Sequence, residues 1–200
     1  MEDNLILIFT RNPELGKVKT RLAASIGNEK TLEIYKFLLQ HTQEIASNVE
    51  ASRRVLYSEE IIKNDIWDNN LYQKSLQSGI DLGEKMKNAF ADGFENKYKK
   101  VVIIGTDLHD LEISDIEIAF HELENNDVVI GPAEDGGYYL LGLKFIPKNI
   151  FENKEWSTET VLKDTLNDLK NFKVHLLDIK NDIDTVDDIK KIEVFQKYLV

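Results

Sequence analysis

One basic segment near the N-terminus has the residue types that bind phosphate groups. Residues 11–21 carry four cations against one acid, in a chain whose formal net charge is -11. The charged residues and the glycine of this segment are Arg11, Glu14, Gly16, Lys17, Lys19 and Arg21. Backbone N–H groups of a glycine-containing loop and cationic side chains together can surround phosphates. A Walker A motif is excluded because Val18 stands where that pattern requires Ser or Thr. The alternative interpretation is a solvated basic loop.

Two acidic segments carry residues that could bind a metal ion. Asp107 follows directly after the apolar run at residues 101–104, and Asp184 lies between Asp182 and the acidic pair Asp187 and Asp188. Acids in the first turn of a helix explain that pair. Two carboxylates, completed by substrate phosphates and water, are a common way to hold Mg²⁺. We therefore expect Asp107 and Asp184 to bind Mg²⁺ or Mn²⁺, with a turn residue as the alternative for Asp107; whether Asp182 shares the metal stays open.

A third loop combines two acids with two glycines. Residues 132–139 contain Glu134, Asp135, Gly136 and Gly137. Glycine lets the backbone adopt positive φ and approach a ligand closely. Asp-Gly between apolar runs also predicts a hairpin turn, and both readings can hold together. We expect these four residues to bind an acceptor, with Asp135 as the catalytic base because Asp107 and Asp184 are committed to the metal.

These segments fall on the loops of an expected α/β arrangement. Continuous apolar runs predict strands that are buried on both faces. Strands are expected at residues 5–10, 53–58, 100–105, 127–131, 138–143 and 174–177. Helices are expected from Asn28 as N-cap, at residues 81–98 and 158–169, and after capping boxes that begin at Ser114 and Thr185. Because strands and helices alternate, we expect helices on both faces of one sheet, with ligands at the carboxyl ends of the strands.

Composition narrows the class of protein. With 36 Asp plus Glu against 25 Lys plus Arg, broad nucleic-acid binding is not expected. No apolar run approaches the roughly 20 residues that a membrane span needs. The chain has no cysteine, which excludes disulfides, thiolate metal sites and a cysteine nucleophile.

Two hundred residues suit a single domain over residues 1–200, and we expect it in the cytoplasm. His41, His121 and His175 are expected to lack partners, and His109 to be a turn residue.

Six colinear motifs resemble one bacterial glycosyltransferase family, often labelled the radical-SAM/selenodomain-associated transferases, within the nucleotide-diphospho-sugar transferase superfamily. The motifs are at residues 9–22, 81–86, 105–108, 131–142, 156–158 and 182–185. More distantly, the chain is similar to phospholactate and molybdenum-cofactor guanylyltransferases. The sequence departs from the family pattern at Arg11, Lys85 and His109, where Lys, Arg and Pro are usual. Arg and Lys are not interchangeable at a bidentate phosphate site, so Arg11 is the least secure correspondence.

The resemblance implies a GT-A fold, a Rossmann-like three-layer sandwich with a mostly parallel sheet and one antiparallel strand. It implies that Asp107 and Asp184 bind the metal, that residues 11–21 hold the donor phosphates, and that Gln77 and Gly83 lie near the base.

The expected activity is metal-dependent transfer from a nucleoside triphosphate or nucleotide sugar to a small-molecule acceptor, with Lys19 assisting catalysis. The cationic first loop favours nucleotidyl transfer and the family label favours glycosyl transfer, so both stay open. A non-catalytic nucleotide-binding or scaffold protein is the alternative of another class.

Overall fold

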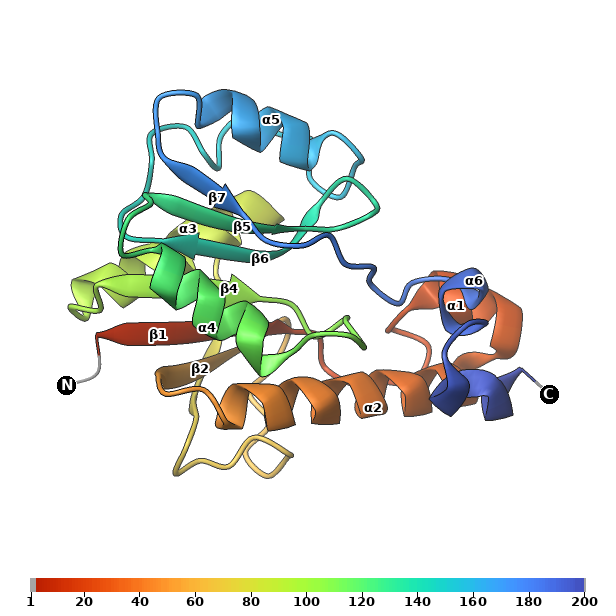
Figure 1. Cartoon of the computed structure of the whole chain (residues 1–200). Helices are drawn as coiled ribbons and strands as arrows, with labels where there is room; N and C mark the ends of the chain where they lie inside the picture. Colours follow the sequence, from red (N-terminus) through yellow and green to blue (C-terminus); the bar gives the residue numbers. More distant parts are fainter. Residues whose placement is uncertain (1–2, 200) are drawn as a thin grey trace.

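The computed structural model describes residues 3–199, which form one seven-stranded sheet covered by helices (Figure 1). In chain order the elements are β1 (Asn4–Thr10), α1 (Thr20–Ile26), α2 (Asn28–Ser47), β2 (Ser52–Tyr57), β3 (Gln73–Leu76), α3 (Leu82–Glu95), β4 (Lys100–Ile104), α4 (Ile113–Glu122), β5 (Val128–Pro132), β6 (Tyr138–Leu143), α5 (Val161–Asp168), β7 (Val174–Leu176), α6 (Val186–Ile189) and the 3₁₀ helix η1 (Glu193–Tyr198).

The strand order is β3-β2-β1-β4-β6-β5-β7. All neighbouring pairs are parallel except those of β6, which runs antiparallel to both β4 and β5. The expected mostly parallel sheet with one antiparallel strand is therefore confirmed. Because β1 and β4 are parallel neighbours, the loops after them emerge at the same edge of the sheet.

Both faces of the sheet are covered, which explains the continuous apolar runs. In β1, Ile6 and Ile8 pack toward α2 and α4, whereas Leu5 and Leu7 pack toward α3 and α5. Successive side chains of a strand point to opposite faces, so a strand with helices on both sides needs apolar residues throughout. The sheet with its two helical layers is the expected three-layer arrangement.

A smaller apolar cluster lies beyond the strand ends. It joins α1, the first half of α2, α6 and η1 through Leu22, Ile34, Leu38, Ile183, Ile189 and Phe195. Figure 1 shows α6 beside α1 at the same end of the molecule, and the two helices are in contact. This packing brings residues near 184 next to the first loop, although more than 160 residues separate them in the chain.

Local details differ from the expectations. The sequence patterns predict neither α1 nor β3. The N-cap of α2 is Gly27, whereas the sequence indicated Asn28, which is the first residue of the helix. The capping box of α4 consists of Glu112 and Asp115, because the helix begins earlier than the pattern at Ser114 indicates. The box at Thr185 and Asp188 is confirmed. Within residues 3–199, no helix combines the length and the apolar character needed to cross a membrane.

Candidate active site at the ends of β1 and β4

A buried lysine contacts the aspartate that follows β4. Lys19 Nζ lies 2.6 Å from Asp107 Oδ2; the Lys19 side chain is 7% exposed and that of Asp107 42%. Lys19 has φ 47°, the left-handed region, and it is the N-cap of α1. Burial lowers the pKa of Lys19, but Asp107, Asp182 and Asp184 together outweigh burial and raise it. Lys19 is therefore a fixed positive charge facing three carboxylates.

A second ion pair lies beside the first. Arg21 Nη1 is 3.0 Å from Asp184 Oδ2, and the Arg21 side chain is 77% exposed. An exposed pair of this kind contributes little to stability because water screens it. The Arg21 guanidinium is therefore free to bind an anionic ligand at small cost. Asp107 and Asp184 both face Lys19, but each is paired with a different cation.

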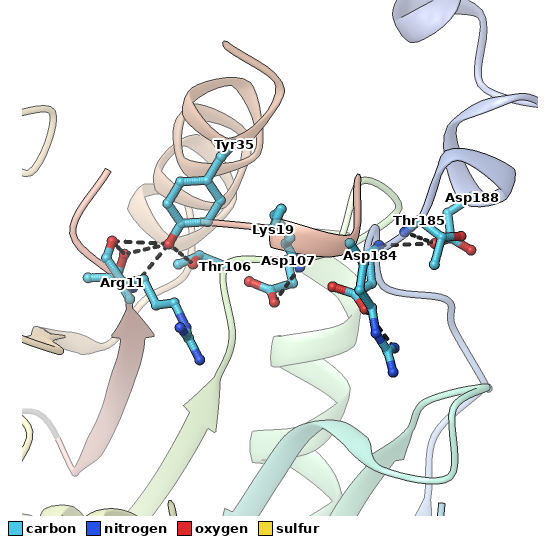
Figure 2. A network of polar contacts seen from close by, with 10 residues as sticks. Arg11, Lys19, Tyr35, Thr106, Asp107, Asp184, Thr185 and Asp188 are labelled. Atoms are coloured by element: carbon cyan, nitrogen blue, oxygen red, sulfur yellow. Dashed lines mark hydrogen bonds and ion pairs between the residues drawn. The ribbon is translucent and has the colours of Figure 1, made fainter. Parts of the chain in front are cut away.

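The capping box of α6 holds the backbone on which Asp184 stands. Asp188 Oδ2 accepts hydrogen bonds from the backbone N–H groups of Asp184 (3.0 Å) and Thr185 (2.5 Å) and from the Thr185 hydroxyl (2.8 Å). Asn181 Nδ2 donates to the other oxygen of Asp188 at 3.0 Å. Asp188 therefore positions Asp184 without facing the site itself (Figure 2).

We expect Asp188→Ala to lower the free energy of unfolding by about 1 kcal/mol, the usual contribution of a helix cap. The matched control is Asp187→Ala, because Asp187 is the neighbouring exposed acid and its ion pair is with Lys190, at 2.6 Å. Urea unfolding of the two variants measures the difference. Equal stability of both would show that the capping box does not hold this segment.

The carboxylates outnumber the cations at this site. Burial raises the pKa of Asp182 to about 6; Lys19 opposes the shift, and Asp135 and Asp107 add to it. The loop that carries Asp135 therefore faces Asp182 from the β5–β6 side. Asp182 pairs in an isolated β-bridge with Leu108, and the N–H of Ile183 donates to the carbonyl of Asp107 at 3.0 Å. These bonds fix the two acidic segments side by side.

Tyr35 joins the ends of β1 and β4 and was not recognised in the sequence as part of the site. Its hydroxyl accepts from the N–H of Arg11 at 3.0 Å, donates to the carbonyl of Arg11 at 3.1 Å and lies 3.3 Å from Thr106 Oγ1 (Figure 2). The helical pattern of α2 assigns Tyr35 to the core, where its ring does lie. The available signal was the hydroxyl, since a buried Tyr O–H needs a polar partner.

Other residues expected at the phosphates lie apart from this centre. Lys17 pairs with Glu14 at 2.8 Å and with Glu59 at 3.5 Å, and its side chain is exposed. Gly16 has φ 77° and provides the turn before it. The Arg11 side chain extends from the end of β1 toward the same side as the Asp107 carboxylate (Figure 2).

Gln77 and Gly83 occupy positions with clear structural roles. Gln77 Nε2 donates to the carbonyls of Thr10 (3.1 Å) and Leu56 (3.0 Å), so it bridges the ends of β1 and β2. A Cβ on Gly83 would lie 2.4 Å from the ring of Trp156, so glycine is needed for this contact. That Gln77 and Gly83 also bind a base stays a prediction.

The glycine-rich loop connects antiparallel β5 and β6, as a hairpin requires. Asp135 Oδ1 accepts a hydrogen bond from the N–H of Gly137 at 2.8 Å, and the Asp135 and Glu134 side chains are exposed. Gly136 has φ 87°, and a Cβ there would lie 2.2 Å from the carbonyl oxygen of Glu159. Gly136 is therefore required where the loop packs against the segment before α5, and its neighbour Asp135 lies near enough to Asp182 to raise the pKa of that carboxyl.

Gly136→Ala is expected to be more destabilising than Gly27→Ala. Both glycines have φ near 90°, but a Cβ on Gly27 meets no atom within 4 Å. Gly27→Ala should cost about 1–2 kcal/mol of backbone strain, and Gly136→Ala about 1–3 kcal/mol more for the clash with Glu159. Denaturant titration of both variants gives the difference. If the two losses agree, the close approach at Gly136 contributes nothing.

The histidines are not free, which corrects the sequence expectation. His41 Nε2 lies 2.9 Å from the carbonyl oxygen of Leu111, and His175 Nδ1 lies 3.3 Å from Glu122. His109 stacks on His41 and Phe37. Burial lowers the pKa of His109, and the neighbouring His41 lowers it further. A surface or core role suits these residues better than metal binding.

The donor set fits a hard divalent cation held partly by its substrate. Carboxylate oxygens are the ligands Mg²⁺ prefers, and Mg²⁺ usually takes only one or two of them together with phosphates and water. Among the residues 3–199 that the structure describes, no three His, Cys, Asp or Glu side chains form a complete metal site. Asp107 and Asp184, which both raise the pKa of Lys19, are two carboxylates of the kind that Mg²⁺ takes; that they share one ion stays a prediction.

Comparison with known proteins places the chain in a family. Residues 41–158, more than half of the chain, match the family described as "Uncharacterized protein conserved in bacteria (DUF2064)". The chain belongs to this family. No functionally curated protein matches it significantly.

Some of the solved structures similar to this DUF2064 protein are transferases or a synthetase by name. A candidate nucleotide-diphospho-sugar transferase from Desulfovibrio desulfuricans G20 is 30% identical, with a TM-score of 0.88 over 100% of this chain and 93% of that one. A cytidylyltransferase from Leptospira borgpetersenii serovar Hardjo-bovis (strain JB197) is 16% identical, with a TM-score of 0.61 over 95% and 84%. A CMP:2-keto-3-deoxy-manno-octonic acid synthetase complexed with CTP is 11% identical, with a TM-score of 0.55 over 98% and 99%. The last two share the fold with this chain.

Proposed function

We propose that this DUF2064 protein catalyses metal-dependent transfer from a nucleotide donor at the ends of β1 and β4. The observation that carries the proposal is the contact of buried Lys19 with Asp107, amid an excess of carboxylates. A buried cation facing a metal-binding carboxylate is suited to donor phosphates that bridge the two. The nucleotide-diphospho-sugar transferase-like fold and the transferases that share it support a nucleotide-dependent reaction.

In this proposal Asp107 and Asp184 hold Mg²⁺ or Mn²⁺. The metal, when bound, neutralises negative charge on the phosphate oxygens of the donor. Lys19 and Arg21 exchange their carboxylate partners for those oxygens. Three residues that precede Lys19 in the first loop complete the phosphate site, either through movement of the loop or through bridging water: Arg11, Gly16 and Lys17.

The acceptor occupies the opposite side, next to the β5–β6 loop. Glu134, Asp135 and the two glycines after them bind it, and where the acceptor is a hydroxyl, Asp135 takes its proton. Gln77 and Gly83 lie near the base of the donor. We further propose that the chain forms a single GT-A domain and that the protein acts in the cytoplasm. As an enzyme it would be a transferase of the radical-SAM/selenodomain-associated type.

Two transfer reactions are compatible with this site. In nucleotidyl transfer an acceptor phosphate attacks the α-phosphorus of a nucleoside triphosphate and pyrophosphate leaves. The cationic first loop and the CTP bound by one protein of the same fold favour this reaction. In glycosyl transfer an acceptor hydroxyl attacks the anomeric carbon of a nucleotide sugar and a nucleoside diphosphate leaves. The name of the 30%-identical protein favours that reaction.

A screen of nucleotides separates the alternatives. The protein is incubated with each common nucleoside triphosphate or nucleotide sugar, with and without Mg²⁺, and its melting temperature is recorded. Donors that stabilise it are then mixed with pools of phosphorylated and hydroxylated metabolites, and the released product is identified. Pyrophosphate indicates nucleotidyl transfer, and a nucleoside diphosphate indicates glycosyl transfer. Stabilisation without either product points to a non-catalytic binding protein, and no stabilisation by any nucleotide contradicts the proposal.

A further inference from the structure

A large cavity lies next to the proposed active site, on the α2 side of the sheet. Its volume is about 860 Å³, within the range of small-molecule sites. It lies between the middle of α2, the connection from β2 to β3 and the start of the first loop. None of the site residues Lys19, Asp107, Asp182 and Asp184 lines it, so it is separate from the carboxylate cluster.

The walls of the cavity are held in place by buried polar contacts. Lys74 Nζ lies 2.7 Å from Asp65 Oδ1 and donates to the carbonyl of Ile62 at 3.0 Å, which fixes the β2–β3 connection. The Tyr57 hydroxyl donates to the other oxygen of Asp65 at 2.6 Å. Trp67 is 2% exposed and packs edge-on against Tyr72. The cavity is therefore preformed, and a ligand would not need to order its walls.

The opposite wall is fixed from the first loop. Buried Asn12 donates through Nδ2 to the carbonyl of Glu60 at 2.8 Å, and its Oδ1 accepts from the N–H of Glu59 at 3.1 Å. The Tyr35 hydroxyl holds the backbone of Arg11, which lines the cavity. The same tyrosine thus supports both the cavity and the strand ends that carry Asp107.

The lining combines an apolar floor with positive charge. Ile66, which is 39% exposed, and Pro13 supply accessible apolar surface above the buried Leu39, Tyr57 and Trp67. Three cations also line the cavity: Arg11, Lys36 and Lys63. Within residues 3–199 these three side chains make no ion pair. The acid Asp65 is neutralised by Lys74, and Asp68 accepts from the N–H of Asn70. In a chain of formal net charge -11, unpaired cations around one cavity favour an anionic ligand.

We propose that this cavity binds a small organic anion, with its ring or branched apolar body against Ile66 and Pro13. Its phosphate or carboxylate faces Lys36 and Lys63, because Arg11 belongs to the proposed donor site. Binding combines desolvation of the apolar body with attraction of the anionic group. Neither inorganic phosphate nor a neutral apolar molecule uses both features, so each binds more weakly than a molecule that joins them.

Trp67, which is buried in the wall of the cavity, is a fluorescent reporter of binding there. It is one of two tryptophans, and Trp156→Phe leaves it as the single fluorescent indole. This variant is titrated, without nucleotide or metal, with phenyl phosphate, benzoate, phenol and inorganic phosphate. Phenyl phosphate or benzoate is expected to give a saturable fluorescence change, and the preferred one identifies the anionic group. Phenol and inorganic phosphate should bind at least about tenfold more weakly. Calorimetry on the unmodified protein repeats the titration if Trp156→Phe does not fold.

Charge variants assign the binding to this cavity. Lys36→Glu with Lys63→Glu is expected to weaken binding of the better probe by at least about tenfold. The matched control is Lys163→Glu with Lys170→Glu, two exposed lysines in and just after α5 on the other face of the sheet, which should leave it unchanged.

Lys19→Met should also retain probe binding, because Lys19 belongs to the proposed donor site and not to the cavity. The proposal is overturned by any of three results: no saturable change up to about 10 mM probe, equal binding by the Lys36/Lys63 variant, or loss of binding in Lys19→Met. None of these results depends on whether a nucleotide is the donor.

Discussion

Lys19→Met is expected to lower the turnover of the nucleotide-dependent reaction by about 10²–10³-fold, the loss typical when one group that stabilises developing charge is removed. Lys19 is the buried cation of the site, with Nζ 2.6 Å from Asp107. Met retains much of the length and the apolar stem of Lys but has no charge. Removing a cation beside Asp107 should not weaken Mg²⁺ binding. Turnover should therefore fall while Mg²⁺ affinity is kept, as measured by initial rates and by calorimetry.

Lys154→Met is the matched control for this result. The Lys154 side chain is 1% exposed and pairs with Asp168 at the end of α5, on the helical layer that contains α3. Loss of the Lys154–Asp168 pair should lower the stability of the protein as the loss of the Lys19–Asp107 pair does. Turnover per folded molecule should stay unchanged. If Lys154→Met and Lys19→Met lose turnover equally, the effect is structural and Lys19 has no role in the reaction.

Asp135→Asn is expected to lower turnover with a hydroxyl acceptor by about 10²–10⁴-fold, the contribution of a general base. The amide oxygen of Asn can still accept the hydrogen bond from Gly137, which is 2.8 Å long with Asp. The loop should therefore keep its conformation while the charge is lost. Because Asp135 lies on the acceptor side, donor affinity should stay within about threefold, a change worth less than 1 kcal/mol. The decisive measurement is kcat together with donor Kd for the two proteins.

Asp127→Asn provides the comparison. Asp127 precedes β5, and its carboxylate accepts from the N–H of Lys173 at 2.9 Å, so the substitution makes the same chemical change at the other end of the strand. This variant should turn over normally. Normal turnover in Asp135→Asn as well would leave Asp135 as a hairpin residue alone.

The sheet could be predicted because its apolar patterns are local. β1 and β4 are buried on both faces, so their residues read as continuous apolar runs. β3 (Gln73–Leu76) could not be recognised, since it lies at the edge of the sheet and is half polar. α1 begins inside the basic segment, at Thr20, after a left-handed Lys19 that no propensity indicates.

The residues of the site divide in the same way: some are identified by a local sequence pattern, and others are brought together only by packing between distant segments. Asp107 was singled out because it follows a buried strand directly, and Asp184 because a helix start explains Asp187 and Asp188 but not Asp184. Their neighbours depend on packing between distant segments: Arg21 reaches Asp184 only because α1 and α6 share an apolar cluster. Lys17 was grouped with Lys19 because both are cations of one segment, yet Lys17 is exposed and pairs with Glu14 at 2.8 Å and with Glu59, which follows β2, at 3.5 Å. Charge counts along a sequence give composition but not side-chain direction.

The most direct test of the account is the effect of Mg²⁺ on donor binding, measured by calorimetry in the wild type and in Asp107→Asn. The donor is the nucleotide that stabilises the protein most in the screen. In the wild type, Mg²⁺ should tighten binding at least about tenfold relative to EDTA, or about 1.4 kcal/mol. In Asp107→Asn, confirmed as folded by circular dichroism, this gain should disappear. If the variant keeps the full Mg²⁺ gain, Asp107 is not a metal ligand and the proposed centre is wrong.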